Sequence, residues 1–390
     1  MKTRVGIVGA GPSGLLLAQI LHNEGIPSVI IEHRSRDYVL ERIRAGVIEP
    51  GAVATFVEHG VGDRLLCEGL PHQEMQLRWN GQMHRFNQVD EDGRQLTTYG
   101  QSAIVRDMIE AREAAGLPIL WNAKVDTVED IEHAPRIHFT RDGQAQTLDC
   151  DYVAGCDGFW GVTRGLIPDI DTHMFLKEYP FSWLGILTQS APNPDKRGYA
   201  HSLRGMAVAS SRSNTICRHY LQVPPETDVN AWSDDAIWDE LDLRFADEGG
   251  ETLNRGPILS KDVVRLRAFF CDRMRHGRLF IAGDAAHIVP PSGAKGLNLA
   301  VGDIRILAEA IRRHVTAGDS GLIENYDATC LQRIRSTVHW SNRLAQTLHI
   351  FPGQTDFDTQ MQMTTLNKWA HTEAGNREFV QSALGEPYPV

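Results

Sequence analysis

Hydrophobic positions near the amino terminus form two short continuous runs on either side of a helix-like segment. Residues 3–8 and 28–31 have the composition of buried strands, and residues 15–24 have the spacing of an amphipathic helix. A strand, a helix and a strand in close succession predict a parallel β-α-β unit, because a parallel connection needs a crossover. The chain therefore begins with the unit from which doubly wound α/β domains are built.

The period of the pattern changes further along the chain. Alternation at every second residue predicts strands in residues 76–86, 95–99 and 124–147, and a further group of strands spans residues 179–223. From residue 297 to 380 the apolar positions recur at helical spacing. An α/β unit, a sheet-built domain and a helical region are thus predicted in that order.

Spacing predicts two shorter helices as well. One covers residues 37–47, and the other carries Arg164 and follows the strand that ends at Asp157-Gly158. A third apolar strand, residues 277–282, runs into Gly283-Asp284. Small residues at such strand ends allow a ligand to approach the backbone closely.

Composition narrows the possible functions. The 390 residues, 42% of them hydrophobic, suffice for two or three domains with large cores. A formal net charge of −11 leaves no basic surplus for binding nucleic acid. No apolar run approaches the ~18 residues of a membrane span, and the chain starts directly with a strand, so we expect a cytoplasmic protein. The histidines and cysteines lack ligand spacing, which predicts no metal.

The loop of the first unit predicts a ligand. Its sequence GAGPSG, residues 9–14, lies between a strand and a helix, and Glu32 ends the second strand. Gly9 permits the tight turn, Gly11 lets a pyrophosphate approach the backbone, and Gly14 lets the helix pack on the strand. An acid about 20 residues further on can accept hydrogen bonds from a ribose diol. The loop alone is a weak signal, but the complete set predicts a bound adenine dinucleotide.

Longer segments resemble a known family. With the GAGPSG loop, the segments RIRAGV (42–47), DYVAGCDGF (151–159), YPFSWLG (179–185) and HGRLFIAGDAAHIVPPSGAKGLNLA (276–300) are similar to the single-component flavoprotein aromatic hydroxylases, and the resemblance covers nearly the whole chain. Simple nicotinamide dehydrogenases differ from this chain, because they have one dinucleotide fingerprint and no counterpart of Gly283-Asp284.

The resemblance implies a fold with three parts. It is an α/β fold with a Rossmann-like FAD-binding domain of the glutathione-reductase type, a β-sheet substrate domain and a helical carboxyl-terminal region. The expected boundaries are 1–175, with a strand insertion near 73–99, then 176–268, and finally 269–390, which joins the Gly-Asp segment to helices. We expect these helices to form a homodimer interface.

The resemblance also implies bound FAD, with NADPH as a reductant that visits and leaves. The residues that match the FAD positions of the family, or lie near them, are Gly9, Gly11, Ser13, Gly14, Glu32, Arg42, Arg44, Gln101, Asp284, Leu297 and Asn298. Those that match or adjoin its NADPH positions are Arg34, Tyr38, Arg42 and Arg267. Trp160 stands where the family often has a histidine near NADPH, so the docking of the nicotinamide stays open. Arg34 and Arg36 favour NADPH over NADH only weakly, so the choice of reductant stays open as well.

The reaction that the resemblance implies is hydroxylation of 4-hydroxybenzoate ortho to its phenol, giving 3,4-dihydroxybenzoate, with O2 and a flavin hydroperoxide. Such a reaction requires exclusion of water and removal of the phenol proton. By resemblance, Tyr199 is the partner of the phenol, the carbonyl of Pro291 is a second contact, and His72 is the outer end of a proton relay.

The carboxylate of the substrate needs a cation and neutral donors. Ser210, Arg212 and Tyr220 match these positions of the family. The spacing of Ser210 and Arg212 places both side chains on one face of a strand, so they can act together on one carboxylate.

Departures from the family gather at the phenol end. Ala383 stands where a second tyrosine of the relay is usual, Ser292 replaces a threonine, and Arg197-Gly198 replaces an apolar pair. Either a water completes the relay and 4-hydroxybenzoate is the substrate, or the enlarged end admits a different ring, as in 3,4-dihydroxybenzoate, 4-hydroxyisophthalate or 4-aminobenzoate. A flavin oxidoreductase that inserts no oxygen is another alternative. A noncatalytic flavin-binding sensor is disfavoured because the carboxylate end is intact.

Overall fold

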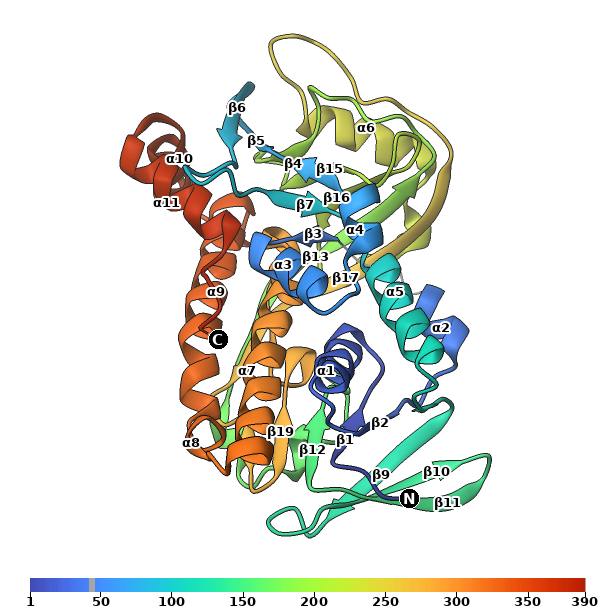
Figure 1. The fold of residues 1–390 in the computed structure, drawn as a ribbon. Helices are drawn as coiled ribbons and strands as arrows, with labels where there is room; N and C mark the ends of the chain where they lie inside the picture. The colour runs from blue at the N-terminus through green and yellow to red at the C-terminus, as the bar shows by residue number, and fades with distance from the viewer. Residues whose placement is uncertain (42–45, 390) are drawn as a thin grey trace.

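The amino-terminal β-α-β unit forms as its hydrophobic pattern predicts. The computed structural model describes residues 1–41 and 46–389 (Figure 1). β1 (Val5–Val8) is buried along its whole length and pairs in parallel with β2 (Ser28–Ile31) and β12 (Tyr152–Gly155). Apolar side chains at every position suit a central parallel strand, because both of its faces are covered.

β1 lies inside a six-stranded sheet with the order β18-β19-β12-β1-β2-β8. The remaining strands of this sheet are β8 (Ile119–Leu120), β18 (Arg275–His276) and β19 (Leu279–Ile281). The helices that pack around it or border it are α1 (Pro12–Asn23), α2 (Arg36–Glu41), α3 (Pro50–Glu58), α4 (Asp63–Glu68), α5 (Gln101–Ala114) and α7 (Gly296–Ala317). α1 packs against both α5 and α7, so the late helix α7 completes the domain that the first residues begin.

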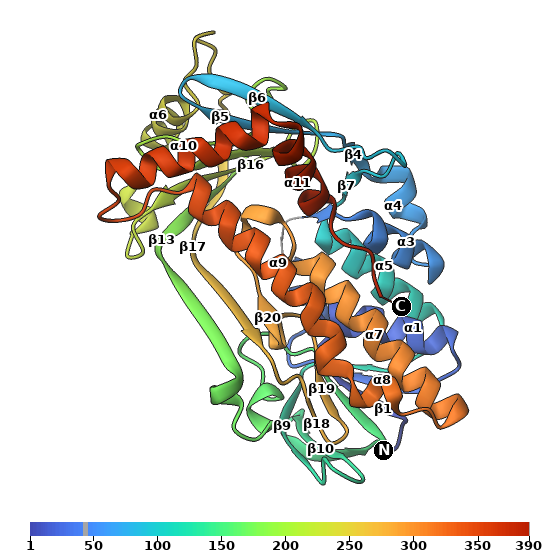
Figure 2. The ribbon, with the colours of Figure 1, turned by 90° about the vertical axis from the view of Figure 1, so that its left-hand side faces the viewer.

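An eight-stranded sheet forms the second layer of the molecule, with the order β20-β17-β13-β16-β15-β14-β5-β6. Its strands are β5 (Glu74–Trp79), β6 (Gln82–Asn87), β13 (Met174–Thr188), β14 (Gly198–Ala200), β15 (Ala207–Ser211), β16 (Cys217–Val223), β17 (Ile258–Cys271) and β20 (His287–Ile288). β13 and β17 are long antiparallel partners that run from this sheet toward the six-stranded one (Figure 2). α6 (Asp234–Arg244) covers one face of this sheet, and its residues Trp238 and Leu241 join the core there.

The early strands are distributed over two sheets. β5 and β6 form a hairpin whose turn residues Asn80 and Gly81 both have positive φ, which a tight two-residue hairpin turn requires. This hairpin joins the eight-stranded sheet through β14. The remaining strands of the region form a small sheet of β3 (Val47–Ile48), β7 (Leu96–Thr98) and β4 (Leu70–His72).

The predicted antiparallel strands in residues 124–147 are confirmed. They form β9 (Ala123–Glu129), β10 (Arg136–Arg141) and β11 (Gln144–Asp149), and the turn between the last two has positive φ at Asp142 and Gly143.

The predicted helical carboxyl-terminal region is confirmed as well. It contains α8 (Gly321–Glu324), α9 (Tyr326–Leu348), α10 (Asp356–His371) and α11 (Glu373–Leu384). The buried rings of Trp340, Trp369 and Phe379 contact one another, and Phe379 also contacts Phe86 of β6. These contacts fasten the helices to the eight-stranded sheet.

Two helix predictions were wrong. The first was predicted over residues 37–47, but within the described residues the helix covers only Arg36–Glu41. Val47 belongs to β3 instead, because it pairs with Thr98. Residues 42–45 lie outside the described part. After β12, Arg164 lies in a 3₁₀ turn, Arg164–Leu166, instead of an α-helix. The backbone N–H and the hydroxyl of Thr163 both donate to the carboxylate of Asp157, at 3.0 and 2.6 Å, which folds this segment back on itself.

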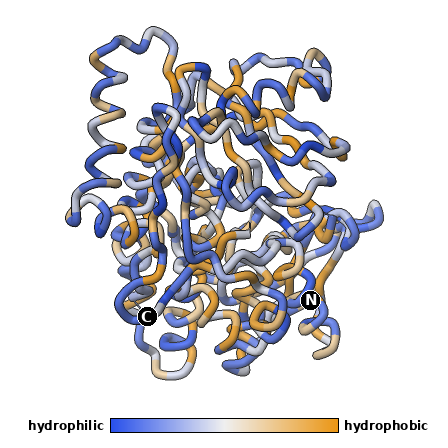
Figure 3. Tube along the Cα trace, turned by 90° about the horizontal axis from the view of Figure 1, so that it is seen from above, coloured by the Kyte–Doolittle hydropathy of each residue, from blue (hydrophilic) through white to orange (hydrophobic). Residues whose placement is uncertain are grey.

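Apolar segments gather toward the middle of the molecule, whereas much of the periphery is hydrophilic (Figure 3). Among the helices of the described ranges, none combines the length and the apolar character needed to cross a membrane. The domain boundaries given above stay predictions.

Candidate active site

The loop after β1 has the geometry of a phosphate cradle. Gly9 has a φ of +105°, and a Cβ there would collide with the carbonyl of Cys156. A Cβ at Gly14 would collide with the carbonyl of Gly9. A Cβ at Gly11, in contrast, would meet nothing within 4 Å, so open space lies over the start of α1. The backbone N–H groups of this helix end fit a pyrophosphate.

Glu32 is fixed beside this loop. Its side chain is 7% exposed, and its Oε2 accepts the N–H of Ala10 at 2.7 Å while its Oε1 accepts the N–H of Arg34 at 2.8 Å. A carboxylate has further lone pairs beyond these two bonds. The residues present therefore fit the ribose of a dinucleotide.

The Gly283-Asp284 turn packs directly on the same loop. Gly283 has a φ of +62°, and a Cβ there would collide with the hydroxyl of Ser13. The exposed Asp284 thus lies close to the cradle although it is far away in sequence. Two buried residues that the sequence analysis missed hold this turn: Asp303 accepts the N–H of Gly283 at 3.0 Å and contacts Nε2 of His287 at 2.5 Å.

The remaining predicted FAD residues within the described part lie at the starts of two helices. Gln101 is the first residue of α5, and Leu297 and Asn298 lie in the first turn of α7. The amide of Asn298 is occupied inside the protein, since it accepts the N–H of Glu49 at 2.8 Å and donates to Val47 and Ala294. This leaves the backbone N–H groups in the first turn of α7 for a ligand. Arg42 and Arg44 lie outside the described residues.

The predicted reductant residues form two groups. The guanidinium of Arg34 lies 4.8 Å from the ring centre of Tyr38. That of Arg267 lies 4.7 Å from Phe159 and 5.6 Å from Trp160, whose side chain is 85% exposed. Arg34 and Tyr38 follow β2, and the group around Trp160 lies at the end of β12. These two strands are the neighbours of β1 in the sheet.

One face of the eight-stranded sheet brings the predicted substrate residues together. Tyr199 of β14 lies opposite Val208 of β15, and Val208 lies opposite Tyr220 of β16. Ser210 follows Val208 by two positions, so its side chain points to the same face. The expected set therefore occupies one surface, as the alternation of the sequence predicts.

Arg212 supplies the positive charge of this face. Its Nε is buried and has no hydrogen-bond partner among the described residues. The hydroxyl of Ser210 donates to the carbonyl of Arg218 at 2.9 Å, and the ring of Tyr220 packs against Trp183. A buried guanidinium nitrogen without a partner is costly, which makes this position suitable for an anionic ligand.

The other end of the face is built around Tyr199. Its hydroxyl donates to the carbonyl of Ser292 at 2.5 Å, and burial raises its pKa well above the usual range. The carbonyl of Pro291 accepts the N–H of Ala294 at 3.0 Å within the 3₁₀ turn Pro291–Gly293. The hydroxyl of Ser292 is buried and has no partner among the described residues.

His72 and Ala383 border this end from different elements. Burial, with the nearby charge of Arg197, lowers the pKa of His72 on β4. Ala383 is buried on α11, and its carbonyl accepts Nζ of Lys295 at 2.5 Å. The segment that carries Ala383 is thereby tied to the segment that carries Ser292.

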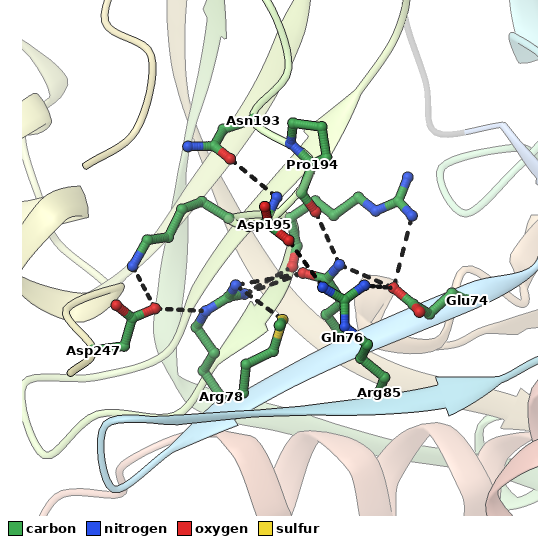
Figure 4. A network of polar contacts seen from close by, with 11 residues as sticks. Glu74, Gln76, Arg78, Arg85, Asn193, Pro194, Asp195 and Asp247 are labelled. Carbon is green, nitrogen blue, oxygen red and sulfur yellow. Dashed lines mark hydrogen bonds and ion pairs between the residues drawn. The ribbon is translucent and has the colours of Figure 1, made fainter. Parts of the chain in front are cut away.

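A network of charges fixes the loop that leads into Tyr199 (Figure 4). Lys196 is only 1% exposed, and its Nζ contacts Asp247 at 2.5 Å and the carbonyl of Phe245 at 3.1 Å. Arg78 donates to the carbonyl of Arg197 at 3.1 Å. The exposed side chain of Arg197 lies 3.8 Å from Glu74. The sequence analysis did not identify Lys196, Arg78 or Asp247, because surface charges have the same local pattern.

Comparison with known proteins agrees with this architecture and defines the class. Residues 2–341 match the family described as "FAD binding domain". The p-hydroxybenzoate hydroxylase of Acinetobacter baylyi is 41% identical over 391 residues, which cover 100% of this chain and 97% of that protein. The chain therefore belongs to the FAD-dependent aromatic monooxygenases. The predicted fold class, enzyme class and FAD cofactor are confirmed.

More distant relatives share the fold. The 3-(3-hydroxy-phenyl)propionate/3-hydroxycinnamic acid hydroxylase of Mycobacterium sp. (strain JLS) is 25% identical over 89% of this chain and 60% of its own length. The crystal structure of p-nitrophenol 4-monooxygenase from Pseudomonas putida superimposes with a TM-score of 0.83 at 18% identity, covering 99% of both chains. At this identity the likeness supports the fold alone.

Gly11→Ala tests the cradle. Because a Cβ at this position meets nothing in the protein, we expect a stable fold but about tenfold or more weaker FAD binding, since the methyl group obstructs the pyrophosphate. FAD titration of the apoprotein followed by fluorescence measures this affinity. Gly165→Ala, which also adds a Cβ in open space, is the matched control and should bind FAD normally. Equal affinities for the two variants would remove Gly11 from the site.

Proposed function

We propose that this enzyme hydroxylates a 4-hydroxybenzoate-type acid at the carbon ortho to its phenol, with NADPH and O2 as co-substrates. The observation that carries the proposal is the buried, unpartnered Nε of Arg212, directly after β15, whose charge acts on the half-buried Tyr199 of β14. A cation and a phenol on one face match an aromatic acid with a hydroxyl group at its far end. The name of the Acinetobacter baylyi relative, at 41% identity, supports the same substrate.

At the carboxylate end, Arg212 pairs with the anion, and Ser210 and Tyr220 supply neutral donors. The hydroxyl of Ser210 then turns from the carbonyl of Arg218 to the substrate. An ion pair is strong here because the guanidinium nitrogen is already shielded from water. This end fixes the orientation of the ring, so that the phenol points toward Tyr199.

At the phenol end, Tyr199 acts as a neutral hydrogen-bond donor when its hydroxyl turns from the carbonyl of Ser292 to the substrate. Its raised pKa keeps it protonated at neutral pH, and a donor stabilises a substrate phenolate. His72 is the residue we assign to the exchange of the substrate proton with solvent. Its lowered pKa keeps the imidazole neutral near pH 7, so it can accept a proton.

FAD, when bound along Gly9 to Gly14, Glu32 and Asp284, supplies the activation of O2. The overall balance is ArH + O2 + NADPH + H⁺ giving ArOH + H2O + NADP⁺. For the reductant we assign Arg34, Tyr38, Arg42 and Arg267, with Trp160 as an exposed ring beside Arg267. The reacting ring must be kept from water, because a reactive oxygen donor is otherwise lost.

Turnover under ¹⁸O2 tests this function. The purified holoenzyme with 4-hydroxybenzoate and NADPH should form 3,4-dihydroxybenzoate that contains one ¹⁸O atom. Mass spectrometry of the product measures incorporation, and NADPH oxidation is recorded separately because reductant can be consumed without hydroxylation. An oxidised product without label would instead identify a flavin oxidoreductase that inserts no oxygen.

Arg212→Ala tests the carboxylate end. Removing the cation should weaken 4-hydroxybenzoate binding by about 2–5 kcal/mol, about 30-fold or more, while FAD stays bound. Perturbation of the flavin spectrum on titration with the acid gives the Kd. Arg265→Ala removes an exposed arginine of β17 that pairs with Glu226 at the surface and should leave the Kd unchanged. An unchanged Kd in Arg212→Ala would exclude its role at the carboxylate.

A second candidate substrate class is favoured by the phenol end. Ala383 is smaller than the tyrosine usual in the family, and the buried hydroxyl of Ser292 has no partner among the described residues. On this proposal, an additional polar ring substituent takes the place of the missing phenol ring and bonds the hydroxyl of Ser292. Candidates are 3,4-dihydroxybenzoate, 4-hydroxyisophthalate and 4-aminobenzoate.

Ala383→Tyr separates the two classes. If the space is used by the substrate, the variant should lose kcat/KM for the substituted benzoates by about tenfold or more while keeping 4-hydroxybenzoate turnover. Product formation across the panel measures the selectivity. Gln381→Tyr adds the same ring on the exposed side of α11 and is the control. Selectivity that is identical in all three enzymes would mean that a water, not the substrate, occupies the space.

A further inference from the structure

Two buried cations share one buried carboxylate near the phenol end. Glu49 is 3% exposed, and its Oε1 contacts Nζ of Lys295 at 2.8 Å while its Oε2 contacts the guanidinium of Arg333 at 2.5 Å. The three residues come from the start of α3, the segment before α7 and the middle of α9. The cluster therefore ties together three elements that are far apart in sequence.

The same two cations hold the carboxyl-terminal segment, residues 383–388. Lys295 donates to the carbonyl of Ala383 at 2.5 Å, and Arg333 donates to the carbonyl of Glu386. The ring centre of Tyr388 lies 4.5 Å from the guanidinium of Arg333, and its hydroxyl donates to the carbonyl of Asn298 at 3.1 Å. In Figure 2 this dark red segment leaves α11 and reaches the side of α7.

The segment lies directly against the buried carboxylate. Gly385 has a φ of +82°, and a Cβ at this position would collide with the carboxylate of Glu49. Glycine is thus required where the chain crosses the cluster. The ring of Tyr388 also lies close to two glycines, Gly51 on α3 and Gly302 on α7. A Cβ added at these glycines would come within 3.0 and 3.2 Å of the ring.

We propose that Arg333 is a positioning residue for hydroxylation. It holds residues 383–388 against Glu49 and thereby keeps water from the phenol end. Two contacts carry the link to the site. Lys295, which shares Glu49 with Arg333, bonds Ala383 and lies three residues from Ser292, whose carbonyl accepts the hydroxyl of Tyr199. Arg333 reaches this site only through other residues and contacts none of the predicted substrate residues among the described contacts.

The inference rests on the proposed function and predicts a specific defect, which is uncoupling. When water enters, reductant and oxygen are consumed as NADPH + H⁺ + O2 giving NADP⁺ + H2O2, and the ring is not hydroxylated. A variant that is merely less stable contains less active enzyme, so it slows hydroxylation and H2O2 formation equally. The ratio of hydroxylated product to NADPH oxidised therefore separates positioning from stability.

The test compares Arg333→Met with Arg335→Met, an exposed arginine on the same helix. With saturating substrate, we expect product per NADPH to fall about threefold or more in Arg333→Met, with H2O2 making up the difference. The Arg335→Met control should match the unmodified enzyme. Arg333→Lys keeps the charge but cannot hold Glu49 and the carbonyl of Glu386 with one planar group, so its coupling should lie in between. Unchanged coupling in Arg333→Met would overturn the proposal.

Hydrogen exchange of the holoenzyme provides a readout that does not depend on turnover. The amides of residues 383–386 and of Tyr388 should exchange about tenfold or more faster in Arg333→Met than in the unmodified enzyme, whereas the peptide that contains β1 should be unaffected. Equal exchange in the two proteins would show that Arg333 does not hold the segment. If the exchange result is as expected but the unmodified enzyme hydroxylates none of the benzoates, the proposed function fails. The conclusion that Arg333 holds residues 383–388 would still stand.

Discussion

The close approach of three backbone segments around the loop after β1 is the constraint on which the rest of the structure depends. The loop itself, the end of β12 and the Gly283-Asp284 turn meet so tightly that Gly9 and Gly283 leave no space for a Cβ. The position of Gly11, in contrast, is open. Because the third segment comes from the last third of the chain, the dinucleotide site is completed only when α7 packs against α1. Cofactor binding and the docking of the carboxyl-terminal region are therefore coupled by geometry.

The eight-stranded sheet uses its two faces differently. On one face, Leu221, Trp238 and their neighbours form a closed apolar core under α6. On the other, Tyr199, Ser210 and Tyr220 alternate with these core positions along the same strands. A sheet with one fully packed face can position polar groups on the other with little freedom, which suits the orientation of a small aromatic ring. The long strands β13 and β17 connect this sheet to the cofactor domain.

The residues that the sequence predicted well are those whose signal is local. The glycines of the loop and the alternation of Ser210 and Arg212 depend on spacing within a few residues. The structure agrees with the first, whereas for the second it places Ser210 on β15 and Arg212 directly after the strand. The ion pairs that hold the site were not predictable in this way. Lys196 contacts Asp247, and Arg333 contacts Glu49, across 51 and 284 positions. The predicted helix at Arg164 failed because a side-chain interaction, Thr163 with Asp157, competed with helical hydrogen bonds.

The two ends of the substrate face differ in the charge that they favour. At the carboxylate end, the unpartnered nitrogen of Arg212 favours an anion directly. At the phenol end the tyrosine is neutral, and the cations of Lys295 and Arg333 have two carboxylates beside them, those of Glu49 and Glu386. Burial also lowers the pKa of Lys295. This cluster therefore offers a nearby anion little net positive charge. In the proposed reaction, the stabilisation of a substrate phenolate thus depends on a directed hydrogen bond from Tyr199 more than on a neighbouring cation.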